Sequence, residues 1–362
     1  MTESQTATHL FSPLTLRSIT FRNRIGISPM CEYSSEDGIA TDWHLVHLGS
    51  RAVGGAGLVI AEATAVSPEG RISPGDAGIW DDKHIEPIAR INRFLKQHGA
   101  VPGLQIAHAG RKASTARPWD GGESLGDDAG GWTTIAPSAI AFGGSLDRVP
   151  HAMLEEDIAR VQGQFVAAAK RSLAAGVECL EFHSAHGYLS HEFLSPISNL
   201  RQDRYGGTFE NRIRFTLETA CAIRNVWPEQ FPLLVRISCT DWVPGGWDIE
   251  QSVELARRLK AEGVDLIDCS SGGSTPDAPI PTYPGYQVPF AERIRREAGI
   301  ATAAVGGITE PSHAEEIIRN GRADLVLLGR ESLREPYWPR LAANKLRKTD
   351  AIPPPVQYRR AW

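Results

Sequence analysis

Three proton-handling side chains follow one another closely in the middle of the chain. His183, His186 and Tyr188 come within six residues, at the end of an apolar-rich run that begins at Val177. Imidazoles and phenols donate, accept and transfer protons, and a strand end that presents several of them is a candidate active-site floor. A lone histidine here would be better explained as a satisfied core or turn residue. Three such groups together favour a catalytic site.

The two histidines admit a second interpretation, a metal pair. Their three-residue spacing on a loop is feasible for zinc, with a third ligand from Glu62, His108 or Glu181. The result would be a metal-dependent barrel hydrolase. That arrangement leaves Tyr188 and Arg236 without a role, so we expect no bound metal and keep the hydrolase as the alternative function.

Strand-like and helical segments alternate along the chain. The expected strands are 24–28, 58–66, 101–108, 177–183, 233–238, 266–271, 301–306 and 324–329, and the expected helices are 42–53, 82–98, 155–175, 209–226, 248–262, 289–298, 311–320 and 334–345. Strict alternation predicts a parallel sheet with helical crossovers, and eight units favour a closed (β/α)8 TIM barrel over an open sheet. We expect one domain over 1–362, with a flexible arm at 1–10, a hairpin at 11–23 and an extended tail at 353–362.

Composition excludes several classes of protein. The 362 residues carry a formal net charge of -5, which gives no basic footprint for nucleic acid. Five cysteines without a CxxC pair indicate a reducing compartment rather than a disulfide framework. No apolar run is long enough to span a membrane, and the first residues do not resemble a signal peptide. We therefore expect a cytoplasmic protein that acts on small molecules.

Two turns suggest a phosphate site. The carboxyl ends of all eight strands would share one mouth, where barrel enzymes keep their sites, and the loops after the last two strands often hold a phosphate. Gly306-Gly307 and Gly329-Arg330 occupy those loops. Glycines let backbone N–H groups approach an anion, and arginine adds a bidentate cation. Tight turns would also explain the glycines, but Arg330 favours phosphate.

Several stretches resemble the old yellow enzyme family, in its thermophilic-like branch of bacterial NADPH dehydrogenases and xenobiotic reductases. The resemblance covers nearly the whole chain in family order. The matching stretches include NRIGISPMCEYS, GLVIAEATAVSPEGR, LQIAHAGRKA, EFHSAHGYLSHEFLSPISNLRQDRYGGTFENR, AVGGIT and GRADLVLLGRESLREP. The resemblance implies bound FMN, NADPH as hydride donor, and reduction of C=C bonds activated by a carbonyl or nitro group.

The same resemblance implies a role for individual residues. The residues implied to hold FMN are Ser28, Pro29, Met30, Cys31, Ala63, Gln105, Arg236, Gly306, Gly329 and Arg330. The residues implied to contact the substrate are Tyr33, His183, His186 and Arg360. His183 and His186 would bind the activating oxygen, and Tyr188 would protonate the α-carbon. A phenol with a pKa of about 10 is protonated at neutral pH and can act as that acid.

The chain ends in PPPVQYRRAW. Three prolines cannot continue a helix and predict an extended, strand-like segment. The resemblance implies that Arg360 reaches into the active site of a neighbouring subunit, in a homodimer or a dimer of dimers. Two departures, a long loop at 112–134 and Glu32 between Cys31 and Tyr33, leave the substrate preference open.

Overall fold

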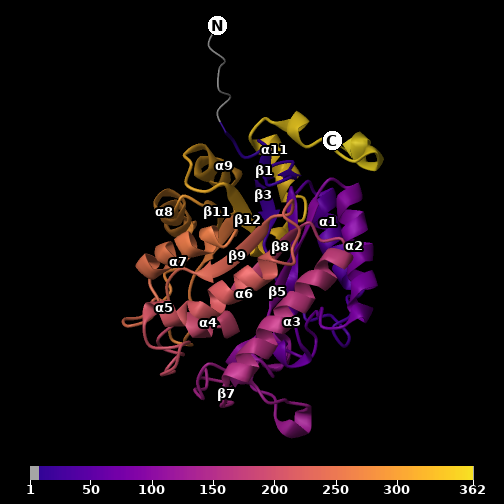
Figure 1. Ribbon diagram of the computed structural model, residues 1–362. Helices are drawn as coiled ribbons and strands as arrows, with labels where there is room; N and C mark the ends of the chain where they lie inside the picture. Colours follow the sequence, from indigo (N-terminus) through magenta and orange to yellow (C-terminus); the bar gives the residue numbers. More distant parts are fainter. Residues whose placement is uncertain (1–7, 362) are drawn as a thin grey trace.

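Eight buried segments pair side by side into a closed parallel barrel (Figure 1). The computed structural model describes residues 8–361. The barrel strands are β3 (Ile25–Ile27), β4 (Leu58–Ala65), β5 (Val101–Ala107), β8 (Cys179–Ser184), β9 (Leu233–Ser238), β10 (Leu266–Ser270), β11 (Ala301–Val305) and β12 (Leu325–Leu328). They pair in chain order, and β12 returns to β3. The predicted (β/α)8 barrel is confirmed.

Helices cover the outside of the barrel. The longer ones are α1 (Asp42–Val53), α2 (Ile85–Gln97), α3 (Glu155–Ala174), α6 (Arg214–Arg224), α7 (Ile249–Ala261), α8 (Val288–Ala298), α9 (Pro311–Arg319) and α11 (Trp338–Lys345). The shorter ones are α4 (Leu189–Leu194), α5 (Phe209–Arg212) and α10 (Arg330–Arg334). The helices predicted over 209–226 and 334–345 differ in the structure. The first is divided at Ile213, and the second begins only at Trp338, after Pro336 has separated it from α10.

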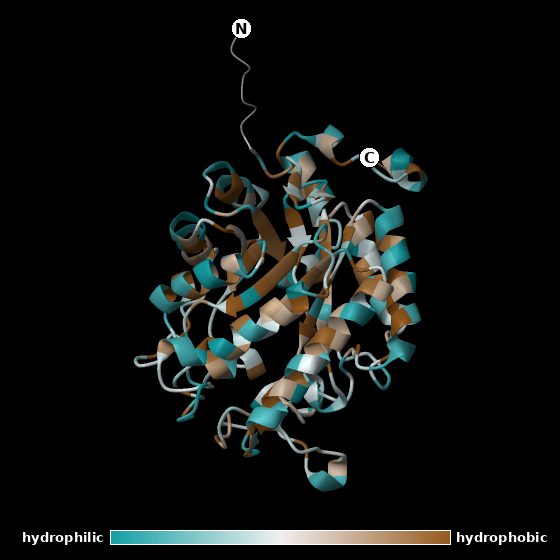
Figure 2. Ribbon diagram, viewed as in Figure 1, coloured by the Kyte–Doolittle hydropathy of each residue, from teal (hydrophilic) through white to brown (hydrophobic). Residues whose placement is uncertain are grey.

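Apolar side chains explain why the strands are central. Figure 2 shows the strands as the most hydrophobic part of the molecule and hydrophilic residues along the outer helices. Inside the barrel, one end is closed by the hairpin of β1 (Leu14–Leu16) and β2 (Ile19–Phe21), whose Leu14 and Phe21 belong to the same apolar cluster as Leu234 and Leu266. Among residues 8–361 no helix is long and apolar enough to cross a membrane.

The N-terminal arm is shorter than predicted. Leu10 is fully buried, and its backbone N–H donates to the Glu315 carboxylate at 2.8 Å. Burial of that side chain fixes the chain here, so residue 10 does not belong to a flexible arm. Residues 1–7 of the predicted arm lie outside the described residues.

Two long excursions lie at the carboxyl ends of the strands. The first follows β5 and carries β6 (Ile135–Ala136) and β7 (His151–Ala152), and the second follows β8 and carries α4. Short 3-10 turns complete the chain: η1 (Pro68–Gly70), η2 (Asp82–His84), η3 (Gly110–Lys112), η4 (Pro118–Asp120), η5 (Asp127–Ala129) and η6 (Thr349–Ala351). Figure 1 shows β7 at the end of the molecule opposite the C-terminal tail. The excursions therefore surround the mouth, as predicted.

The C-terminal tail coils instead of extending. Pro353–Pro355 form no regular structure, but Val356–Ala361 form the 3-10 helix η7, so the predicted strand-like segment is wrong there. The coil is closed by the Tyr358 N–H, which donates to the Pro355 carbonyl at 2.9 Å. Trp362 lies outside the described residues.

The base of the tail is anchored far from the mouth. Ile352 is buried and packs against Gly55, in the turn that leads into β4. Arg340 ties this point to the barrel by donating to the Ile352 carbonyl at 2.9 Å and to the Val53 carbonyl at 3.0 Å. The tail therefore leaves the barrel at the end where strands begin.

Candidate active site

The predicted trio of proton-handling residues gathers at the end of β8. The His183 ring lies 5.2 Å from the ring centres of both His186 and Tyr188. A left-handed backbone at His186, with φ of 59°, turns the chain sharply here. The His186 N–H donates to Ser238 Oγ at 2.9 Å, and its Nε2 lies 2.6 Å from Ser270 Oγ. The neighbouring strands β9 and β10 thus hold the turn in place.

Both histidines are neutral at physiological pH. Burial lowers the pKa of His183 and of His186 well below the usual range, and the nearby Arg236 cation adds to the effect. Nδ1 of His183 is buried and has no hydrogen-bond partner among residues 8–361. A buried polar atom that the fold leaves unpaired is costly, and it marks a place where a ligand completes the structure.

Tyr188 keeps its proton. Burial raises the pKa of its phenol well above the usual value, and Cys31 and Tyr33 act in the same direction. Lys112 Nζ lies 5.0 Å over the Tyr188 ring and donates to the His186 carbonyl at 2.9 Å. Burial also lowers the pKa of Lys112 to about 8. Sequence reasoning missed this lysine, whose only signal was its position in the loop after β5.

Next to this trio, a cavity of about 440 Å³ opens at the mouth. The residues predicted to hold a cofactor that line it are Ser28, Pro29, Met30, Arg236, Gly306, Gly329 and Arg330. His186 lines it too. The structure therefore brings most of the predicted cofactor residues, from β3, β9, β11 and β12, to one cavity.

One end of the cavity suits a phosphate. A Cβ added to Gly329 would meet only Met30 Sδ at 3.9 Å, so the backbone there faces open space. The Arg330 guanidinium lines the same space and makes no hydrogen bond or ion pair with any residue of 8–361. An exposed backbone beside an uncompensated guanidinium is a site for a dianion. These groups fit the phosphate of FMN.

Sequence reasoning missed two further residues of this cavity. Tyr286 and Gln287 line it from the loop after β10. Gln287 accepts from Ser271 Oγ at 2.6 Å and donates to the Val305 carbonyl at 2.9 Å. A Cβ at Gly306 would come within 2.7 Å of the Gln287 amide, so glycine is required by this close approach as well as by a φ of 110°.

The remaining predicted cofactor residues lie beside the cavity. Ala63 and Tyr188 line a small neighbouring recess. Gln105 is buried below, where its Nε2 donates to Glu181 Oε1 at 2.7 Å. Burial raises the pKa of the Cys31 thiol well above its usual value. Cys31 is therefore a thiol and not a nucleophilic thiolate.

The long excursion after β5 meets the site at Tyr33. The Trp119 ring lies 5.9 Å from the Tyr33 ring in an edge-on contact, and the Arg117 guanidinium stands 6.0 Å from the Trp119 ring. Trp119 is 63% exposed. The 112–134 loop therefore adds an aromatic and cationic wall to the mouth.

The metal alternative finds no ligand set. Among residues 8–361 no three His, Cys, Asp or Glu side chains are placed to hold a metal ion. Of the third ligands considered, Glu62 lies 3.1 Å from His44, Glu181 accepts from an amide, and His108 Nδ1 accepts from the Gly110 N–H at 3.1 Å. Each of these side chains already has one partner apart from His183 and His186.

Arg360 lies away from the cavity of its own chain. It is exposed, on a tail anchored at the opposite end of the barrel. A contact with substrate would therefore have to be made in a second copy of the chain.

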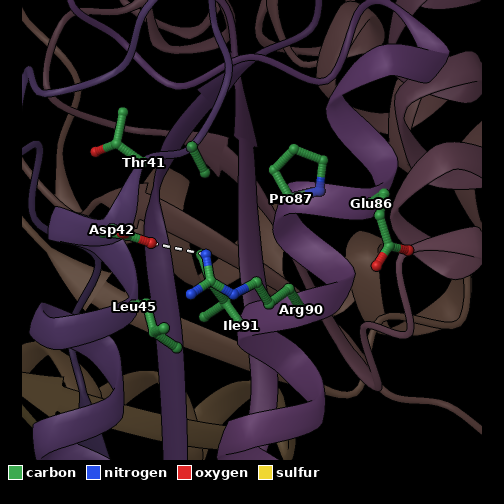
Figure 3. A pocket seen from close by; sticks show the side chains of 8 residues that line it. Thr41, Asp42, Leu45, Glu86, Pro87, Arg90 and Ile91 are labelled. Carbon is green, nitrogen blue, oxygen red and sulfur yellow. Dashed lines mark hydrogen bonds and ion pairs between the residues drawn. The ribbon is translucent and has the colours of Figure 1, made fainter.

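Another hollow, of about 310 Å³, lies outside the barrel between α1 and α2 (Figure 3). Its apolar walls include Leu45 and Ile91, and its polar groups include an ion pair of Arg90 and Asp42, 2.7 Å apart. Both charged side chains are mostly exposed. This hollow holds none of the groups predicted to do chemistry, so the barrel mouth remains the candidate active site.

Known proteins with similar sequences decide the family. Residues 9–349 match the NADH:flavin oxidoreductase / NADH oxidase family. The chain belongs to this family, that of the old yellow enzymes. An NADPH dehydrogenase of Geobacillus sp. (strain WCH70) is 52% identical over 98% of this chain and 99% of its own length. That of Bacillus subtilis (strain 168) is 48% identical over 98% of this chain and 100% of its own.

Solved structures of old yellow enzymes share the fold. Morphinone reductase in complex with tetrahydroNAD superimposes with a TM-score of 0.78 at 27% identity, over 94% of this chain and 91% of that chain. The old yellow enzyme homologue from Zymomonas mobilis gives 0.79 at 25% identity, over 93% of each chain. The chain is thus an FMN-dependent oxidoreductase, and its mouth cavity has the groups that FMN requires.

Proposed function

We propose that this old yellow enzyme reduces C=C bonds conjugated to a carbonyl or nitro group, with NADPH as the hydride donor. The buried, unpaired Nδ1 of His183, beside His186 and Tyr188, carries the proposal. Bound FMN would supply the hydride carrier between NADPH and the β-carbon of the alkene. The residues of the chain bind, polarise and protonate the substrate.

His183 and His186 polarise the alkene through its activating oxygen. Because both imidazoles are neutral, each has one N–H, and neither carries a charge that would trap an anionic product. Nε2 of His186 is engaged with Ser270 Oγ, which leaves its Nδ1 for the substrate. Preorganised donors in a site of low dielectric stabilise the oxygen as negative charge develops on it. Arg236, close enough to affect both rings, contributes a fixed positive field.

Tyr188 supplies the proton to the α-carbon. Its raised pKa means that the phenol is fully protonated at neutral pH, so the acid form is always present. A buried phenol is a weak acid, and it transfers its proton only when the polarised alkene has gained carbanion character. The order of events therefore follows from the protonation states of these three residues.

The mouth and the tail determine which alkene enters. Tyr33, backed by Trp119, forms one wall. We assign Arg360 to the substrate site of a second subunit, because its own chain carries it at the far end of the barrel. Exposed Trp43 and Val46 on α1 are candidates for the face that pairs two copies into a homodimer, alone or within a dimer of dimers. The five unpaired cysteines suit the reducing cytoplasm.

Separate half-reactions test the function. Anaerobic NADPH should bleach the flavin of the parent protein, and a simple enone should restore its colour. Tyr188→Phe should leave reduction by NADPH intact and slow reoxidation by the enone by about 10²–10⁴-fold, as expected for loss of a general acid. Stopped-flow absorbance of the flavin measures both rates.

The matched control is Tyr205→Phe. Tyr205 donates to Glu218 at 2.9 Å beneath α6, away from the cavity, so its loss should change neither half-reaction. A flavin that NADPH reduces and that no enone or nitroalkene reoxidises would contradict the proposed function.

A further inference from the structure

A layer of charged and polar side chains lies directly beneath the cavity. Gln105, Glu181, Arg236 and Asp268 come from four consecutive strands, and the register pairs Gln105 with Glu181 and Asp268 with Arg236. All four are at least 94% buried. Below them the barrel is apolar and closed by the hairpin. The proposed chemistry uses Arg236, but it gives Glu181 and Asp268 no function.

The two carboxyl groups face different partners. Asp268 Oδ2 lies 3.2 Å from Arg236 Nε, and the same guanidinium donates from Nη1 to Ser28 Oγ at 3.1 Å and lines the cavity. Glu181 Oε1 accepts from the Gln105 amide at 2.7 Å, and Glu181 Oε2 and both Asp268 oxygens have no hydrogen-bond partner among residues 8–361. One carboxyl is therefore opposite a cation, and the other is opposite a neutral amide.

This layer holds one positive charge for two acids. The groups around Glu181 are Gln105 on β5, Arg236 on β9, Asp268 on β10, and Cys179 and His183 on its own strand. A second buried carboxylate would have no cation left to pair with, which is unfavourable in a low dielectric. Burial raises the pKa of both acids, and Arg236 opposes that shift in each of them. The pKa of Glu181 rises to about 8, and Asp268 adds to that shift.

We propose that Asp268 is the ionised member of this layer and a positioning residue that tunes the reduction potential of FMN through Arg236, while Glu181 is a neutral acid. A flavin that has accepted hydride carries a negative charge, which a nearby guanidinium stabilises. Asp268 compensates part of the Arg236 charge and so limits that stabilisation. The inference depends on FMN in the cavity, but not on which alkene is reduced.

The test is the midpoint potential of the flavin in the holoenzyme. Asp268→Asn keeps the shape and removes the charge, so Arg236 should favour the reduced flavin by about tenfold more, or about 30 mV for a two-electron couple. Glu181→Gln is the matched control, since it replaces a group that is already neutral. At pH 7 it should leave the potential unchanged.

The pH dependence separates the two acids further. As pH rises through about 8, Glu181 of the parent ionises and adds a negative charge near the flavin, so the potential should fall more steeply than in Glu181→Gln. A Glu181→Gln potential that moves as far as that of Asp268→Asn at pH 7 would overturn the inference. So would an unchanged potential in Asp268→Asn.

A variant that loses flavin does not leave the question open. If Asp268→Asn fails to retain FMN, the pH slopes of the parent and of Glu181→Gln decide: parallel slopes overturn the inference, and a steeper parent supports it. Reoxidation by an enone, measured on the same samples, reports separately on the proposed function. A protein that fails that assay can still show the predicted potentials.

Discussion

Two buried histidines from one short stretch of this chain, His183 and His191, have opposite surroundings. His191 is fully buried, and its Nδ1 accepts from the Gly187 N–H at 2.8 Å while its Nε2 lies 3.1 Å from Asp241 Oδ1. His183 is also buried, but its Nδ1 has no partner among residues 8–361. The ring nitrogens of His191 are thus engaged within the fold, whereas Nδ1 of His183 is buried and unpaired beside His186, which lines the cavity.

The carboxylate beside His191 makes the difference. Burial alone would raise the pKa of Asp241, but His191, the Ser195 hydroxyl and the Trp247 N–H together lower it to about 2. This network fixes α4 to the loop after β9. No carboxylate bonds to His183 or His186 in residues 8–361, and burial, aided by the Arg236 cation, lowers the pKa of both rings and keeps them neutral. His191 is thus paired with a carboxylate within the fold, whereas Nδ1 of His183, which is assigned to chemistry, has no partner among residues 8–361.

Of the substitutions considered, removal of the Asp241 carboxylate beside His191 should have the largest effect on stability. Asp241→Ala leaves His191, Ser195 and Trp247 without their acceptor, and breaking a buried pair costs about 3–5 kcal/mol in the free energy of unfolding. Urea denaturation measures this loss. Asp42→Ala, which removes an exposed ion pair with Arg90, is the control and should cost at most about 1 kcal/mol.

The pH dependence of stability has a definite sign. The pKa of Asp241 is lower in the folded chain than the value of about 3.9 expected when unfolded. This carboxylate therefore stabilises the fold above about pH 4, and that contribution is lost as pH falls toward 2. If the stability of the parent and of Asp241→Ala changed identically as pH falls, the stabilising role assigned to the Asp241 carboxylate would be wrong.

Removing the imidazole of His183 should leave the stability of the fold nearly unchanged and slow the reaction with the alkene. His183→Ala should slow reoxidation of the flavin by an enone about 10²–10³-fold, the usual cost of one donor to a developing oxyanion. The melting temperature should stay close to that of the parent, because no hydrogen bond to His183 Nδ1 is lost. A large drop in stability of His183→Ala with unchanged kinetics would show that His183, like His191, serves the fold and not the reaction.

Substitution of Arg330, whose guanidinium is unpaired at the other end of the cavity, should have the smallest effect. Arg330→Ala removes a charge-assisted contact to the phosphate of about 1.5–3 kcal/mol, so FMN should bind about 10- to 100-fold more weakly. Titration of the apoprotein with FMN measures the change. Arg334→Ala is the control, because Arg334 lines the same cavity but already pairs with Glu331 at 2.5 Å. Equal losses of FMN affinity in Arg330→Ala and Arg334→Ala would contradict the assignment of Arg330 to the phosphate.

The barrel could be predicted because its signals are local and repeated. Each strand is a short apolar run, and left-handed glycines end several crossovers, including Gly176 and Gly263. The convergence of strand ends then brought His183, Arg236 and Arg330 together without any knowledge of distances. A pattern that repeats along the chain, such as these apolar runs and glycines, can be recognised without knowledge of tertiary contacts.

The remainder depended on contacts between distant segments. Lys112 and Gln287 come from loops whose paths are set by other loops, through the His186 carbonyl and Ser271. Leu10 is buried because Glu315, far along the chain, receives its N–H. Glu181 and Asp268 have the same positions as ordinary strand residues, and only their packing around Arg236 distinguishes them. Pairwise burial of this kind leaves no periodic signal in a sequence.

We have proposed that neutral His183 and His186 bind the activating oxygen of the alkene. The most direct test of this proposal is the affinity of the holoenzyme for a substituted phenol as a function of pH. Its phenolate oxygen resembles the oxygen of the reduced alkene, and the flavin spectrum reports binding. We expect that, corrected for the ionisation of the phenol itself, affinity is flat between about pH 6 and 7, because neutral imidazoles do not titrate there and Lys112 and Glu181 titrate only near pH 8. The double variant His183→Ala/His186→Ala should bind about 10²-fold more weakly. An affinity that rises steeply as imidazolium forms below about pH 7, or that survives the double substitution, would contradict it.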